Sequence, residues 1–201
     1  MRTPFSILIA VAIFALGACT PDPDPAPTTD VAPLASLELA VDGIGDVLFG
    51  LDPDTVVADV SARFGSPDLD SGWIPAEPNI FGNCPGEQMR AIGWGSLVAI
   101  FIDDGTSDLG GFFYTYTYGY DYAENAGGFD PRGLALTTAG GVGLGTSVAT
   151  AKTEFNDLTI SGDADLDVWS FESASAGFRG LVTGPDSNDT ITLIEPRDGC
   201  S

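Results

Sequence analysis

The sequence predicts an α+β fold with two tandem related halves, each a short helix (or helical pair) packed on an antiparallel sheet. The first observation is a glycine-rich turn followed by a helix-like run, which occurs at residues 43–64 and again at 141–155. The second is a later pair of segments, 93–98 and 177–182, in which an aromatic residue near glycines leads into an apolar strand. Hydrophobic residues make up 44% of the chain, which is enough for a packed interior.

The first 36 residues are expected to lie outside this domain. Arg2 and the apolar run 5–16 form a leader too short to span a bilayer. Leu16-Gly17-Ala18-Cys19 then has the small-residue pattern that precedes cleavage, so we assign residues 1–18 to a signal peptide. Residues 19–36 are rich in proline and aspartate and are expected to form an extended linker to the domain at 37–201.

A cysteine directly after Leu-Gly-Ala resembles a bacterial lipobox, which implies a lipid on Cys19. The protein is then expected to be an extracytoplasmic, membrane-anchored lipoprotein that contacts the membrane through that lipid only. The alternative is an ordinary signal peptide that is cut nearby, with Cys19 incidental.

The charge of the chain is strongly unbalanced. It carries 29 acidic residues against 7 basic ones and no histidine, for a formal net charge of −22. Such a surface repels phosphate backbones, which argues against nucleic acid as a partner. It also argues against electrostatic binding to anionic lipid.

The first half covers about residues 37–121 and is expected to open with a strand at 37–41. Asp52 is the expected N-cap of its helix, with Pro53 at the first helical position and Gly65 at the end. Four apolar residues recur between them at helical spacing: Val56, Val57, Val60 and Phe64. Residues 66–86 are rich in proline and glycine and are expected to form a long loop.

The second half covers about residues 132–201, after a glycine-rich bridge at 122–133. Thr146 is the expected cap of its shorter helix, whose apolar face comprises Val148, Ala151 and Phe155. A closing strand is expected at 190–194.

Two cysteines, Cys84 and Cys200, remain if Cys19 carries lipid. In an oxidising compartment such a pair is most simply a disulfide. Zinc is poorly supported because two thiols without histidine fall short of the usual ligand set. A catalytic cysteine lacks a histidine to activate it.

Residues 111–120 predict a strand in which alternate side chains form one aromatic face. That face would contain Phe112, Tyr114, Tyr116, Tyr118 and Tyr120. One interpretation exposes it as a binding surface with Trp94 or Trp73 at its edge, because tyrosine is favoured at interfaces and its hydroxyl needs a partner when buried. The other interpretation places the aromatic face in the core under the helices.

Two patterns imitate cofactor sites but have the wrong spacing. Asp163, Asp165 and Asp167 begin like a calcium loop, yet position six is Val168 and position twelve is Ala174. The G-x-G-x-G run at 141–145 differs from the dinucleotide motif, and no lysine follows it at the phosphate-loop position. We expect no metal and no cofactor.

With its two glycine–helix–strand copies, the lipobox and Cys84/Cys200, the chain from residue 38 to 201 resembles the tandem α+β repeats of β-lactamase-inhibitory proteins. It is also similar to the single repeat of the small lipoprotein of the outer-membrane β-barrel assembly machine, and it looks like secreted bacterial lipoproteins. The resemblance implies helices packed on an antiparallel sheet and binding through an aromatic sheet face. The first helix of this chain stands almost alone and no strict inhibitor motif is evident, so target and contact residues are not carried over.

The expected function is non-enzymatic binding of a protein partner or cell-wall ligand in the envelope, at the face that carries Tyr114, Tyr116 and Tyr118. The rival is an acidic cell-wall or carbohydrate-active hydrolase that uses an Asp/Glu pair. Such an enzyme requires two carboxyl groups close together in an aromatic-lined cleft. A third interpretation is a structural lipoprotein whose tyrosines belong to the core.

Overall fold

The computed structural model describes residues 37–106, 110–121, 128–129, 134–163 and 165–200. The expected signal peptide, Cys19 and the linker lie outside this part of the chain, as does most of the bridge at 122–133. Within the described residues, no helix has both the length and the apolar composition needed to cross a membrane.

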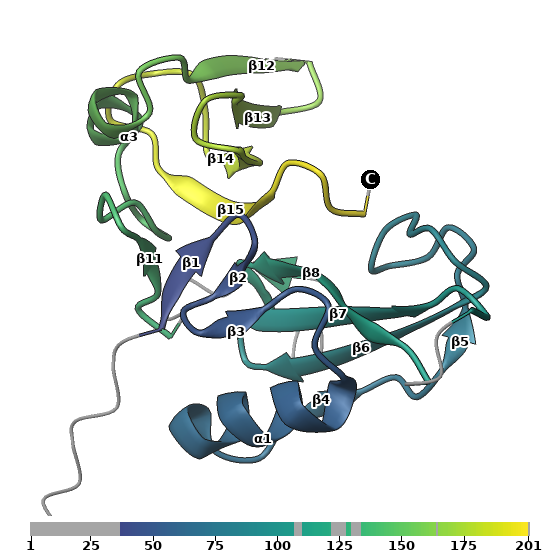
Figure 1. Ribbon diagram of the computed structural model, residues 1–201. Helices are drawn as coiled ribbons and strands as arrows, with labels where there is room; N and C mark the ends of the chain where they lie inside the picture. Colours follow the sequence, from purple (N-terminus) through teal and green to yellow (C-terminus); the bar gives the residue numbers. More distant parts are fainter. Residues whose placement is uncertain (1–36, 107–109, 122–127, 130–133, 164, 201) are drawn as a thin grey trace, which may run out of the picture. The chain divides into compact units, whose positions relative to one another are not determined.

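A nine-stranded antiparallel sheet dominates the structure (Figure 1). In spatial order the strands are β12 (Thr159–Asp163), β13 (Val168–Ser173), β14 (Phe178–Val182), β15 (Ile191–Pro196), β8 (Phe112–Tyr118), β7 (Leu97–Asp103), β6 (Gln88–Trp94) and β4 (Leu69–Asp70), with β5 (Ile74–Pro75) off this path. The short strand β5 pairs with β6 beside β4. Two strand meanders, β6–β7–β8 and β13–β14–β15, are joined where β15 pairs with β8, and their register there is Ile194 opposite Tyr118.

The remaining strands are short. A four-stranded sheet has the order β11 (Thr137–Thr138), β1 (Glu38–Ala40), β2 (Gly43–Ile44) and β3 (Val47–Leu48). Its β1–β11 pair is parallel and brings together segments about 100 residues apart in sequence. A further pair consists of β9 (Tyr120–Asp121) and β10 (Gly128–Phe129). Together with the two helices of the described residues, these sheets agree with the α+β class.

Helix α1 (Pro53–Phe64) begins and ends where the sequence predicts. The Asp52 carboxylate accepts hydrogen bonds from the backbone N–H of Thr55 at 3.0 Å and from its hydroxyl at 2.7 Å. Pro53 occupies the first turn, and Gly65 ends the helix with a φ of 85° that side chains disfavour. Val56 and Val60 are completely buried, as the apolar spacing requires.

Helix α3 (Val148–Glu154) begins one residue later than expected, because Ser147 and not Thr146 is its N-cap. The Ser147 hydroxyl accepts the backbone N–H of Thr150 at 3.2 Å. The Thr146 hydroxyl is already used in the preceding turn, where it accepts the N–H of Gly143 at 3.0 Å. Val148 and Ala151 are buried, which confirms the expected apolar face.

Side chains divide between the two faces of the nine-stranded sheet. The main core lies on one face and includes buried residues of both described helices, Val56 and Val60 of α1 and Val148 and Ala151 of α3. On the opposite face a smaller group, here called the disulfide cluster, packs under the segment 76–87. Its buried members are Phe81, Cys84, Met89, Ala91, Val98, Ile100, Ile102 and Cys200.

Candidate functional site

The expected single row of aromatic side chains on β8 is wrong, because a β-bulge interrupts the alternation. Ile100 pairs with Thr115, whereas the next residue, Phe101, pairs with Phe113, so Tyr114 is the extra residue of the bulged strand. The bulge places Phe113, Tyr116 and Tyr118 in the main core with no exposed surface. Phe112 and Tyr114 pack against the disulfide cluster on the opposite face and are partly exposed.

The two buried tyrosine hydroxyls of β8 have partners inside the protein. Tyr116 donates to the carbonyl of Ala40 at 3.0 Å, and Tyr118 accepts the N–H of Leu136 at 3.2 Å. Burial raises the pKa of Tyr116, so its phenol stays neutral. The core interpretation therefore holds for Tyr116 and Tyr118, which cannot form an exposed binding surface.

Trp94 also belongs to the core and not to a surface. Its side chain is 2% exposed, and Nε1 donates to the carbonyl of Gly65 at 3.1 Å. This contact anchors the C-terminal end of α1 to β6. Tyr114, which was expected in the same binding face, donates its hydroxyl to the carbonyl of Asp198 at 3.2 Å.

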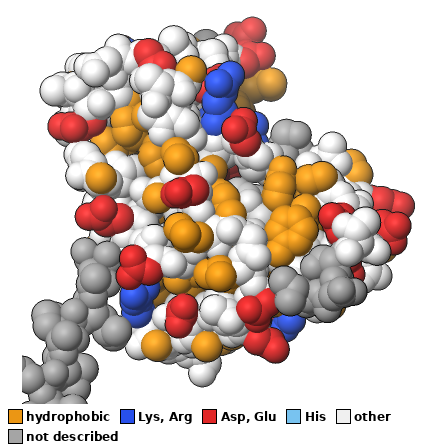
Figure 2. Space-filling model, in the orientation of Figure 1, with side chains coloured by type: hydrophobic (Ala, Val, Ile, Leu, Met, Phe, Trp, Pro, Cys, Tyr) orange, Lys and Arg blue, Asp and Glu red, His pale blue; other side chains and the backbone are white. Residues whose placement is uncertain are grey.

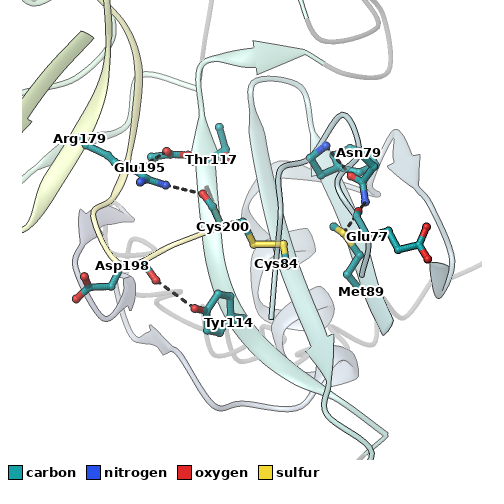
Figure 3. The surroundings of a disulfide bond; sticks show 11 residues. Glu77, Asn79, Cys84, Met89, Tyr114, Thr117, Arg179, Glu195, Asp198 and Cys200 are labelled. Atoms are coloured by element: carbon teal, nitrogen blue, oxygen red, sulfur yellow. Dashed lines mark hydrogen bonds and ion pairs between the residues drawn. A yellow bond between two sulfur atoms is a disulfide. The ribbon is translucent and has the colours of Figure 1, made fainter. Parts of the chain in front are cut away.

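The disulfide between Cys84 and Cys200 is confirmed, with the two Cα atoms 4.5 Å apart (Figure 3). It holds the residues after β15 against the segment 76–87. Gly82 lies so close that a Cβ added there would approach the Cys200 Cβ to 3.1 Å. Asn79 shapes the segment by accepting the N–H of Phe81 through its side-chain oxygen at 2.8 Å.

A groove of about 490 Å³, here called the sheet groove, lies beside this disulfide. Its floor consists of side chains that alternate with main-core residues along the strands and so occupy the sheet face opposite the helices. The floor residues are Thr117, Thr159, Ser161, Ser170, Glu172, Arg179, Leu181, Leu193 and Glu195. One wall is formed by residues 80–82 and Cys200, with Tyr120 also in the lining.

An ion pair occupies the floor of the sheet groove (Figure 3). Strand register sets Arg179 of β14 directly opposite Glu195 of β15. Arg179 Nε donates to Glu195 Oε1 at 2.9 Å, and Arg179 Nη2 donates to the carbonyl of Cys200 at 2.5 Å. The hydroxyl of Thr117 donates to Glu195 Oε2 at 3.2 Å. Burial raises the pKa of Glu195, and the nearby Arg179 guanidinium partly offsets that rise.

A second ion pair lies next to the first. Glu172 of β13 is the register partner of Arg179 on its other side, and its carboxylate binds Arg197 Nε at 2.5 Å. Two glutamates and two arginines therefore balance in charge, in a chain of formal net charge −22. Figure 2 shows how acidic side chains outnumber basic ones over one face of the molecule.

The chemistry available to the sheet groove is limited to hydroxyls and these ion pairs. The chain has no histidine, and Cys84 and Cys200 are joined to each other. Among the described residues no group of three or more potential ligands is placed to hold a metal. Asp163 uses its Oδ1 to accept the N–H groups of Asp165 and Leu166, which closes the turn after β12.

Sequence reasoning missed Glu172, Arg179 and Glu195. Their proximity depends on register between strands, which one sequence does not reveal. A signal was present, because Arg179 and Glu195 each interrupt an apolar strand, and a charge buried in a sheet requires a partner. Comparison of the chain with protein-family models, curated proteins and solved structures finds no match.

Proposed function

We propose that this protein is a non-enzymatic binding protein of the bacterial envelope, held at the membrane by a lipid on Cys19. The sheet groove, and not the aromatic strand, is the site that receives the partner or cell-wall ligand. The observation that carries this proposal is a groove of about 490 Å³ whose floor holds hydroxyls and two ion-paired glutamates, Glu195 with Arg179 of the floor and Glu172 with Arg197 beside it. Grooves of this size with a few converging polar groups are the usual form of ligand sites.

The rival hydrolase requires one carboxyl group that holds a proton and a second that acts as base or nucleophile. Glu195 and Glu172 lie in one groove, and burial raises the pKa of Glu195 as a proton donor requires. However, both oxygens of Glu195 accept hydrogen bonds, from Arg179 and Thr117, and this favours its ionised form. Glu172 is engaged by Arg197. Because each carboxylate already has its own arginine, the arrangement favours binding over acid–base chemistry.

The tandem relation of the two halves belongs to the same proposal. Each half runs from a turn through one helix into an antiparallel meander, β6–β7–β8 in the first and β13–β14–β15 in the second. Both helices contribute to the main core on one sheet face. Because both helices contribute to the core on one face, the opposite face of the two meanders carries the sheet groove and the disulfide cluster.

The proposal is tested by capture from native envelope extract with the full-length chain. Ser170→Trp places a large ring on the groove floor, and Ser66→Trp adds the same ring at an exposed position after α1, as the matched control. We expect wild type and Ser66→Trp to retain the same component and Ser170→Trp to lose it, with unchanged circular dichroism.

Retention by a folded Ser170→Trp variant would show that the sheet groove is not the binding site. The hydrolase alternative is assayed on the same preparations. Release of soluble fragments from cell wall by wild type, with no release by Glu195→Gln, would favour the enzyme instead.

A further inference from the structure

We propose that the sheet groove binds a neutral ligand with adjacent hydroxyl groups, that is, a segment of an uncharged glycan. This inference rests on the proposed function and specifies the ligand class for the same site. Three features of the sheet groove carry it: a donor and an acceptor side by side, hydroxyls around them, and balanced charge.

The Arg179–Glu195 pair presents both halves of a hydrogen-bonding site. Arg179 uses Nε and Nη2 in its two hydrogen bonds, and within the described residues its Nη1 has no partner. Each oxygen of Glu195 accepts one bond, although a carboxylate oxygen has room for about two. The side chains remain 29% and 20% exposed, so a ligand can reach them.

Neighbouring hydroxyls on a sugar ring match this pair. Each hydroxyl both donates and accepts, so one can accept from Arg179 while the next donates to Glu195. The hydrogen bonds involve an ionised partner on the protein side and are therefore among the stronger ones. An extended peptide instead spaces its donors and acceptors along its backbone at about 3.3 Å per residue, on alternating sides.

Hydroxyls of the floor extend the same pattern. Ser161 and Ser170 bond each other at 3.1 Å, and Thr159 donates to the carbonyl of Glu172 at 3.3 Å. A hydroxyl that donates once can still accept. Leu181 and Ile80 add apolar surface, and Ile80 is 64% exposed, which suits the C–H faces of a sugar ring.

The charge balance selects a neutral ligand. Glu172 and Glu195 are matched by Arg197 and Arg179, so the floor offers no unpaired acid for a cation and no unpaired base for an anion. The net charge of −22 also repels an anionic ligand from the protein as a whole. Neutrality at the site predicts that affinity changes little with salt, because screening acts on net charges.

The experiment is isothermal titration of the full-length chain in a detergent without a sugar headgroup. The probes are neutral tetramers of β-1,4-linked glucose and N-acetylglucosamine, the anionic tetramer of galacturonic acid, and a tetra-alanine amide. We expect at least one neutral tetramer to bind at least tenfold more tightly than the uronate or the peptide. The dissociation constant should change less than twofold between 50 and 500 mM salt.

Two variants tie the binding to the residues. Arg179→Gln should weaken binding at least tenfold, while Arg90→Gln, which removes an ion pair with Asp70 outside the groove, should leave it unchanged. If Arg179→Gln unfolds, Ser161→Trp at an exposed position of β12 blocks the floor without removing the ion pair.

Absence of binding by both neutral tetramers would overturn the inference, as would equal or tighter binding of the uronate or the peptide. Unchanged affinity in a folded Arg179→Gln or Ser161→Trp variant would do the same. These failures are separable from failure of the proposed function. If no sugar binds but Ser170→Trp still loses its envelope component, only the ligand class is wrong, whereas retention of that component by Ser170→Trp removes the site itself.

Discussion

Replacing Cys84 and Cys200 together by alanine should lower the free energy of unfolding by about 5 kcal/mol at 25 °C. The disulfide joins residues separated by 116 positions, and a loop of that length restricts the unfolded chain strongly. The chain-entropy model gives about 5 kcal/mol for such a loop. Since domains are stable by about 5–15 kcal/mol in total, the variant should be marginal at 37 °C.

The assay is equilibrium unfolding in urea, monitored by tryptophan fluorescence under oxidising conditions. With a slope of about 2 kcal/mol per molar, the midpoint should fall by roughly 2.5 M. The slope itself should increase, because an unlinked unfolded chain exposes more surface. Cys19→Ser is the control, since it removes a cysteine but leaves the disulfide in place.

A midpoint shift below about 0.5 M, equivalent to about 1 kcal/mol, would refute this reasoning. It would mean that contacts of the disulfide cluster hold the segment 76–87 in place without the covalent link. A large shift with an unchanged slope would also contradict the entropic explanation, because the effect would then lie in the folded state.

Three further results are expected. Tyr116→Phe leaves the Ala40 carbonyl without its buried donor and should cost about 1–2 kcal/mol of stability in urea unfolding; no change would mean that water replaces the hydroxyl. Gly180→Ala brings a methyl group against the carbonyl of Leu193 in β15 and should cost about 3 kcal/mol, whereas an effect below about 1 kcal/mol would show that the strands separate easily. Hydrogen bonds from Ser173 and Ser175 lower the pKa of Asp157 to about 2, below its unfolded value of about 4. Its stabilisation is therefore present above pH 4 and lost as the pH falls towards 2, so thermal unfolding between pH 5 and 2 should change more in wild type than in Asp157→Asn. If the unfolding temperatures of wild type and Asp157→Asn changed equally with pH, the lowered pKa of Asp157 would be contradicted.

The first helix was predictable because its signals are local. Asp52, Pro53 and Gly65 each act on the backbone within one turn of the helix, and no distant contact competes with them. The cap of α3 was misplaced by one residue because Thr146 and Ser147 carry the same kind of hydroxyl. The choice between them is made by the Gly143 N–H, which Thr146 accepts.

The aromatic strand shows where alternation misleads. Reading residues 112–120 with a period of two assigns five aromatic residues to one face. The bulge at Tyr114 instead leaves Phe112 and Tyr114 on one face and Tyr116 and Tyr118 on the other, and Tyr120 lies in β9. Nothing in the run of aromatic and threonine residues marks the extra residue. The bulge is set by pairing with β7, and that partner lies outside the local sequence.

The sheet groove could not be assembled from the sequence for the same reason. Glu172, Arg179 and Glu195 lie on three strands whose side-by-side order follows from the β13–β14–β15 pairing. The disulfide was predictable because only two cysteines remained to pair, yet the sequence did not show that it borders the sheet groove. Local residue patterns therefore predicted the helices and the disulfide, whereas the sheet groove depends on the register between strands, which is not predictable from one sequence.

The long sequence separation between Cys84 and Cys200 also determines how early in biosynthesis the disulfide can form. At roughly 5–20 residues per second, the 116 positions that separate them take roughly 6 to 23 s to synthesise. Through that time Cys84 is a free thiol with its native partner not yet made, open to mixed disulfides with other thiols. The meander β6–β7–β8 can pair earlier, whereas the wall of the sheet groove is completed only after Cys200 arrives. Because β15 carries Glu195 and ends four residues before Cys200, the floor and this wall of the sheet groove are both completed at the end of synthesis.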